Sequence, residues 1–294
     1  MGTTRRGESR SAETISSSLV KGNPVSNINW PNENPYQAPQ SDLSNKDVIA
    51  GGPWTMDYFG GISFFNSNPN WLSNVFMAGL AGIIPIVGPI VLMGYGFETA
   101  ELLHRSGGKV YWDFNFNRFG EYLTRGLGPF LISLVLGILQ FAISMGLQIG
   151  LHMVILGAAA QQQQGGQGGG GAEVIVAILS NVLAYGIQLL FYFVNFPLNL
   201  RGGLANEVGQ SFQFGFALEF AGKVWLEMIL VALCYVLFGL VAFPVILLTC
   251  CVGILPVMGY GALLNGWFSY QLYRLYLSRG GQPIPLKPLP HMPQ

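Results

Sequence analysis

Long apolar runs with almost no charged residues constrain this chain more than any other feature. Only 10% of its 294 residues are charged, whereas a soluble domain carries roughly a quarter. A helix needs about 20 apolar residues to cross the hydrocarbon layer of a bilayer. The runs therefore predict an all-α, polytopic integral membrane protein, and the four longest cover residues 127–157, 174–200, 225–249 and 255–277.

Two shorter apolar runs precede these four. As helices, residues 72–84 would be about 20 Å long and residues 85–103 about 28 Å long. The pair predicts a short hairpin with Pro85, Gly88 and Pro89 near its tip. A single bent crossing over 72–103 is the alternative, which would give five crossings and place the N-terminus outside.

Repeated segments divide the apolar runs into three units. The pattern G-I-[I/L]-P-[I/V]-x-G occurs at 82–88 and again at 253–259, and an arginine followed closely by two glycines ends each unit. We therefore expect three helical-hairpin repeats of about six apolar helices, over about 72–103, 127–200 and 225–277, with interfacial amphipathic helices between them. Five residue pairs lie 98 positions apart: Phe114/Phe212, Phe116/Phe214, Glu121/Glu219, Tyr122/Phe220 and Arg125/Lys223.

The distribution of basic residues predicts the orientation. The three expected outer turns, at 82–89, 158–172 and 250–256, contain no Lys or Arg. Because basic loops stay in the cytoplasm, we expect a multi-pass protein of the cytoplasmic membrane with both termini cytoplasmic. The basic residues of the opposite side are Arg105, Lys109, Arg118, Arg125, Arg201, Lys223, Arg274, Arg279 and Lys287.

Two polar ends flank the expected membrane domain, which covers 54–281. Residues 1–53 are rich in Ser, Asn, Pro and Gly and have no apolar period, so we expect a disordered cytoplasmic tail. Residues 282–294 contain closely spaced prolines, which exclude a helix and predict an extended tail.

Few residues suggest chemistry. Glu101 and His104 have the Glu-x-x-His spacing of a di-metal carboxylate motif, with Glu98 one turn earlier, but the second such motif is missing from the sequence. An interfacial Glu101–Arg105 pair at i, i+4 is the favoured interpretation. Glu227 lies two residues after Trp225, so we expect it to reach the membrane interface rather than to form a site in the apolar run.

Polar and small residues in the runs predict helix contacts. His152, with Gln140 and Gln148, marks one face of the run 127–157, where an interhelical hydrogen bond is expected rather than a ligand or a proton relay. Gly146 and Gly150 form a G-x-x-x-G face for close approach of another helix. Pro197 predicts a kink, where Asn195 or Asn199 could bond the freed carbonyl.

Several classes of site are not expected. No catalytic, cofactor-binding or metal residues are predicted, because no known catalytic motif occurs and only three histidines exist. The cysteines Cys234, Cys250 and Cys251 lack C-x-x-C spacing and are interpreted as packing residues. Fourteen basic and fourteen acidic residues cancel, so a nucleic-acid partner is not expected.

The sequence resembles the bacterial and archaeal membrane family known as domain of unknown function 4013. The resemblance covers roughly 54–287, and Asn34-Pro35-Tyr36 is similar to the cytosolic tail of one bacterial branch. It implies a multi-helix membrane protein without an assigned activity, so it supplies no functional residues. The residues that carry it are Asn68-Pro69-Asn70-Trp71, 84–89 with Gly94-Tyr95, Trp112-Asp113, 211–216, 271–276 and 283–286.

The favoured function is a non-enzymatic membrane scaffold or complex subunit, in contact with the lipid bilayer and with a membrane-protein partner or a second copy. Glycine-rich faces and the long tail favour it. A small-molecule or lipid transporter is the alternative, because Gly/Pro-interrupted helices at corresponding positions of repeats are typical of transporter sites. A membrane-embedded lipid enzyme using Glu98, Glu101 and His104 ranks last.

Overall fold

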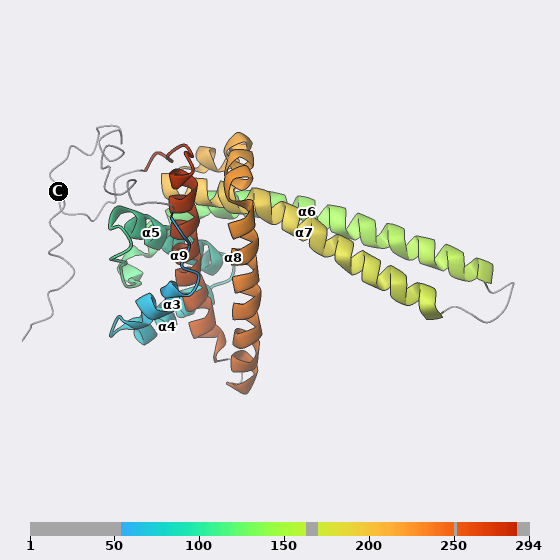
Figure 1. The fold of residues 1–294 in the computed structure, drawn as a ribbon. Helices are drawn as coiled ribbons and strands as arrows, with labels where there is room; N and C mark the ends of the chain where they lie inside the picture. The colour runs from blue at the N-terminus through green and yellow to red at the C-terminus, as the bar shows by residue number, and fades with distance from the viewer. Residues whose placement is uncertain (1–53, 163–169, 250–251, 287–294) are drawn as a thin grey trace, which may run out of the picture. The chain divides into compact units, whose positions relative to one another are not determined.

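The structure, a computed structural model, describes residues 54–162, 170–249 and 252–286. In these ranges it contains helices and no strand, which confirms the all-α prediction (Figure 1). The predicted tail 1–53, the cysteines Cys250 and Cys251 and the chain from 287 lie outside the described residues. The elements are α3 (Gly60–Asn66), α4 (Trp71–Gly82), α5 (Val87–Arg105), η2 (Phe116–Arg118), α6 (Phe119–Gln162), α7 (Gly170–Ala205), η3 (Val208–Phe212), α8 (Phe214–Leu248) and α9 (Ile254–Ser278).

Helices α5 and α9 form the centre of the buried core. α5 contacts α4, α6, α7 and α9, and α9 also contacts α3, α4 and α8. Both helices bury most of their side chains. Their backbones approach closely at Gly96 and Gly266, where a β-carbon on Gly266 would lie 2.7 Å from the Gly96 carbonyl oxygen. Small residues at such contacts are typical of packed membrane helices.

The two copies of the repeated pattern meet between α4 and α9. A β-carbon on Gly79 would overlap the carbonyl group of Leu255, and a β-carbon on Gly259 would overlap that of Val75. A β-carbon on Gly82 would lie 2.9 Å from the Met258 side chain. The segments 82–88 and 253–259 are therefore neighbours in space, which their sequence separation alone could not predict.

The predicted break between the first two apolar runs occurs at residues 83–86. Ile86 has a φ of 65°, a left-handed conformation that turns the chain directly before α5. The Gly88 N–H donates to the Ile84 carbonyl over 2.7 Å, so Gly88 and Pro89 lie in the first turn of α5 rather than at the tip. α4 has 12 residues and is about 18 Å long, shorter than a hydrocarbon layer of about 30 Å.

Three described helices are long and apolar enough to cross a membrane: Phe116–Val154, Ala177–Ala205 and Phe214–Leu248. Their side chains are mostly exposed, as expected for surfaces that face lipid. α6 and α7 lie side by side (Figure 1). α8 kinks at Val224, whose φ and ψ of −132° and 25° are not helical. This kink lies at the predicted boundary between the amphipathic stretch and the apolar run that begins at Trp225.

Between residues 280 and 286 the described chain folds back along α9 without forming a further helix. The Gln282 N–H donates to the Tyr276 hydroxyl over 2.9 Å, and the Ile284 N–H donates to the Tyr273 hydroxyl over 2.8 Å. The Ile284 side chain is buried. This return segment, residues 280–286, thus packs against the C-terminal end of α9.

Candidate functional site

Two buried carboxylates on α5 form ion pairs with one arginine of η2 and one near the start of α6. Glu98 Oε1 lies 2.7 Å from Arg118 Nη1, and Glu101 Oε2 pairs with Arg125 Nη2. Glu98, Glu101 and Arg125 are 4%, 0% and 4% exposed. Such burial is tolerated only when charges are paired, so this network is the strongest concentration of charge inside the described fold.

Two further charges complete the network. Arg105 lies one turn after Glu101 and brings Nη2 to 2.7 Å from its Oε1. Glu121 lies 3.1 Å from Arg118 Nη2. Three carboxylates and three guanidinium groups therefore balance one another. The structure confirms the predicted Glu101–Arg105 pair and adds Arg125 as a second partner that the sequence analysis missed.

Local geometry explains how the chain brings these residues together. Glu98 and Glu101 lie three residues apart in α5, so they share one face. The Asn115 side chain accepts a hydrogen bond from the Asn117 N–H over 2.9 Å and starts the 3-10 turn η2, which carries Arg118. The Arg118 guanidinium is 4.4 Å from the centre of the Trp112 ring, a cation–π distance that holds it in place.

An uncharged polar cluster connects α4, α5 and the loop before η2. The Asn74 side chain donates to the Tyr95 hydroxyl over 3.0 Å and accepts from the Phe114 N–H over 2.6 Å. The Tyr95 hydroxyl also donates to the Trp112 carbonyl over 3.1 Å. Asn74 and Tyr95 are buried, so these bonds hold in place the loop before η2 and thereby position Arg118.

Tyr111 belongs to the same loop and contacts α3. Its hydroxyl donates to the Phe65 carbonyl over 3.4 Å, and its ring packs edge-on against the Phe65 ring. Burial raises the pKa of Tyr111 above its ordinary value. The phenol therefore stays protonated and remains a donor at neutral pH.

The suspected di-metal cluster does not form. Glu101 is paired with Arg105 and Arg125, and the His104 ring packs at a tilt against the Tyr273 ring, with 4.9 Å between the ring centres. In the described parts of the chain, no group of three or more His, Cys, Asp and Glu side chains is arranged to hold a metal.

Glu227 is joined to the end of α9. Its two oxygens lie 2.5 and 3.1 Å from the Arg279 guanidinium. Arg279 also donates to the Lys223 carbonyl, and Lys223 Nζ donates to the Gly280 carbonyl over 2.6 Å. Glu227 therefore joins α8, just after its kink at Val224, to the end of α9, a pairing that the sequence did not predict.

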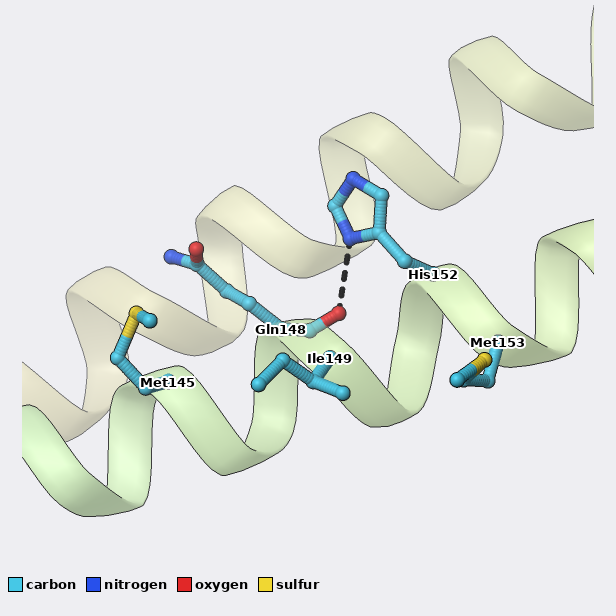
Figure 2. Close-up of a pocket in the computed structure, with 5 residues that line it drawn as sticks. All are labelled: Met145, Gln148, Ile149, His152 and Met153. Atoms are coloured by element: carbon cyan, nitrogen blue, oxygen red, sulfur yellow. Dashed lines mark hydrogen bonds between the residues drawn. The ribbon is translucent and has the colours of Figure 1, made fainter.

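The predicted interhelical bond of His152 is wrong for the described chain. His152 Nδ1 bonds to the Gln148 carbonyl, 2.8 Å away in its own helix, and both side chains line a shallow pocket with Met145, Ile149 and Met153 (Figure 2). The G-x-x-x-G prediction is also wrong within this chain. Nothing lies within 4 Å of a β-carbon built on Gly146 or Gly150.

Hydrogen bonds between α6 and α7 do occur nearer the start of α6 and the end of α7. Asn199 Nδ2 donates to Ser133 Oγ over 2.8 Å, and Ser133 Oγ donates to Asn195 Oδ1 over 3.2 Å. The two asparagine side chains predicted to bond a carbonyl freed by Pro197 therefore bond to α6 instead. The signal for this contact was a serine in an apolar run, which the sequence analysis passed over.

These features indicate to which class of protein the chain belongs. An all-helical chain with three described helices long and apolar enough to span a bilayer, and with its charges paired inside, is a membrane protein. The chain belongs to the family described as "Protein of unknown function (DUF4013)", whose model matches residues 77–260, more than half of the sequence. This confirms the family that the sequence resembles. No curated protein and no solved structure matches the chain.

Proposed function

We propose that this protein is a non-enzymatic scaffold or complex subunit of the cytoplasmic membrane. Its membrane domain, residues 54–281, would hold six apolar helices as three hairpins, α4–α5, α6–α7 and α8–α9. All three would enter the bilayer from the cytoplasmic side, which leaves both termini in the cytoplasm.

One observation supports the shared orientation: the charged ends of consecutive hairpins bind one another. Glu101 near the end of α5 pairs with Arg125 near the start of α6. Arg201 near the end of α7 lies 4.9 Å from the Phe216 ring in α8. Within the third hairpin, Arg279 after α9 pairs with Glu227 in α8. Basic residues at these shared ends fit the cytoplasmic side, and the described turn 83–86 has no charge.

The pairing of the buried polar groups with one another favours a scaffold over a transporter. Glu98 and Glu101 are bound to arginines, and α4 and α9 pack backbone against backbone at Gly79 and Gly259, beside the paired glycine-proline segments. Meanwhile α6, α7 and α8 direct large apolar side chains outward. Such an arrangement suits contacts with lipid and with other membrane helices.

A small-molecule or lipid transporter remains the second proposal. It is favoured by the meeting of the two interrupted segments between α4 and α9, since repeat interfaces are common binding places in transporters. The two proposals differ in what the purified protein does. A transporter moves solute or lipid across vesicles that contain it alone, whereas a scaffold needs its partners.

The test is capture from native membranes followed by mass spectrometry of bound proteins and lipids, with reconstitution of the same preparation into vesicles. We expect one or more membrane proteins at near-stoichiometric amounts and no flux above that of empty vesicles. Flux by the chain alone, with no protein partner, would overturn the scaffold proposal. Reporter fusions after Gly166, Gly203 and Gln294 test the orientation: an exported-side reporter should be active only after Gly166.

A further inference from the structure

The glycines of α5 and α6 fall into two groups. The first group, such as Gly94 and Gly126, lies where α5 and α6 cross, and a β-carbon there would overlap the backbone of the neighbouring helix. Farther along α6, Gly146 and Gly150 have nothing within 4 Å of a β-carbon position. Gly94 and Gly126 therefore pack between helices of this chain, while Gly146 and Gly150 leave an open face on α6.

The same stretch of α6 carries two polar side chains with unused hydrogen-bonding capacity. A carbonyl oxygen only accepts, so His152 Nδ1 must donate to the Gln148 carbonyl. The neutral ring then presents Nε2 as an acceptor. The Gln148 amide offers two N–H donors and has no hydrogen-bond partner among the described residues. Figure 2 shows both side chains on the same stretch of α6 as Met145 and Met153.

Two polar side chains of α7, in contrast, form hydrogen bonds within their own helix. Asn181 Nδ2 donates to the Ala177 carbonyl over 2.7 Å, and Ser180 Oγ donates to the same carbonyl over 2.9 Å. Each of these side chains donates one hydrogen bond within its own helix. Both Gln148 and His152 lie in the candidate span Phe116–Val154, where acyl chains offer neither donors nor acceptors.

We propose that α6 pairs with α6 of a second copy of this chain, with Gln148 of each copy donating to His152 Nε2 of the other. A two-fold axis brings a patch against its own copy. A face that holds a donor and an acceptor one helical turn apart then satisfies both groups of both copies at once. This self-complementarity selects a second copy, whereas Gly146 and Gly150 lie on the opposite side of α6, about 200° around the helix. The inference rests on the proposed function and identifies one of the partners.

The test counts subunits of the full-length protein by single-molecule photobleaching in lipid vesicles over a range of protein densities. Gln148→Leu combined with His152→Leu should weaken dimerisation about tenfold, the effect of losing two interhelical hydrogen bonds of ordinary strength in bilayers. Exchanging the two residues, Gln148→His with His152→Gln, should preserve the dimer, because each donor still meets an acceptor.

Matched controls separate this interface from general effects. Asn181→Leu removes an exposed amide of α7 that lies outside the proposed interface, and it should leave dimerisation unchanged. Gly146→Val, on the side of α6 opposite Gln148 and His152, and Gly239→Val, at an equally open glycine of α8, should both leave the dimer unchanged. A native protein that is monomeric at all densities, or a double leucine variant as dimeric as the native one, would overturn the inference. If other membrane proteins still co-purify in that case, the scaffold proposal stands without it.

Discussion

Gly94 of α5 and Gly126 of α6 exclude a β-carbon from each other's position. A β-carbon on either residue would lie 3.0 Å from the backbone nitrogen of the other, and would overlap a carbonyl oxygen of the facing helix more closely still. This crossing brings α6 near enough to α5 for Glu101 to reach Arg125. Helix packing and buried charge therefore depend on the same two glycines.

The first prediction concerns this crossing. Gly94→Ala or Gly126→Ala should lower the free energy of unfolding by about 1–3 kcal/mol or more, because the helices must separate to admit a methyl group. Thermal unfolding in detergent, followed by the fluorescence of a thiol or tryptophan probe, measures the loss. Gly120→Ala is the matched control, since nothing lies within 4 Å of its β-carbon position in the same helix; equal losses at both sites would contradict the packing argument.

The second prediction concerns the buried ion pairs. Arg125→Met should destabilise the protein by about 3–5 kcal/mol, because a buried Glu101 carboxylate loses a partner. Adding Glu101→Leu should recover part of that loss. Glu219→Gln, which breaks the more exposed Glu219–Lys223 pair, should change stability by less than about 1 kcal/mol. Chemical denaturation in detergent compares these three variants with the native protein, and the pair is unimportant if Arg125→Met behaves like Glu219→Gln.

The third prediction concerns the polar cluster around Asn74. Asn74→Leu leaves the Tyr95 hydroxyl and the Phe114 N–H without that partner and should cost about 1–3 kcal/mol for each buried group left unsatisfied. Limited proteolysis within residues 106–115 should accelerate, because this loop loses its attachment. Asn70→Ala serves as the control, since the exposed Asn70 side chain makes no capping bond to α4. Unchanged proteolysis in Asn74→Leu would disprove the attachment.

The fourth prediction concerns the return segment 280–286. Tyr273→Phe removes the acceptor of the Ile284 N–H and should speed hydrogen exchange at that amide about tenfold, the effect of a hydrogen bond near 1.4 kcal/mol. The Gln282 amide, which is bound by Tyr276, should respond less. Tyr185→Phe, on an exposed part of α7, should leave both amides unchanged. Equal exchange in wild type and Tyr273→Phe would show that the segment is held by other contacts.

Local patterns in the sequence predicted local structure well. The break before α5 and the change of helix character at Val224 follow from proline, glycine and apolar periodicity, which act over a few residues. The Glu101–Arg105 pair follows from i, i+4 spacing. The family was also recognisable from short motifs, and the family model confirms it.

Contacts between distant segments could not be predicted in the same way. Glycine spacing favoured Gly146 and Gly150 as the close-approach face, but the structure uses Gly94 and Gly126, which belong to different helices and form no motif in the sequence. Arg125 reaches Glu101 only because α5 and α6 cross at those glycines. Likewise, nothing in the local sequence around Glu227 indicates that Arg279 is its partner.

The pairing of Glu98 with Arg118 has a consequence for biogenesis. The ribosome releases α5 before it releases residue 118, so for a time the carboxylate of Glu98 has no counter-ion. Placing a lone carboxylate in a bilayer costs several kcal/mol, and α5 should therefore wait at the insertion machinery until the next helix begins to emerge. In the proposed topology, the α4–α5 hairpin would then enter the membrane only together with the start of α6, which would make their insertion a single cooperative event.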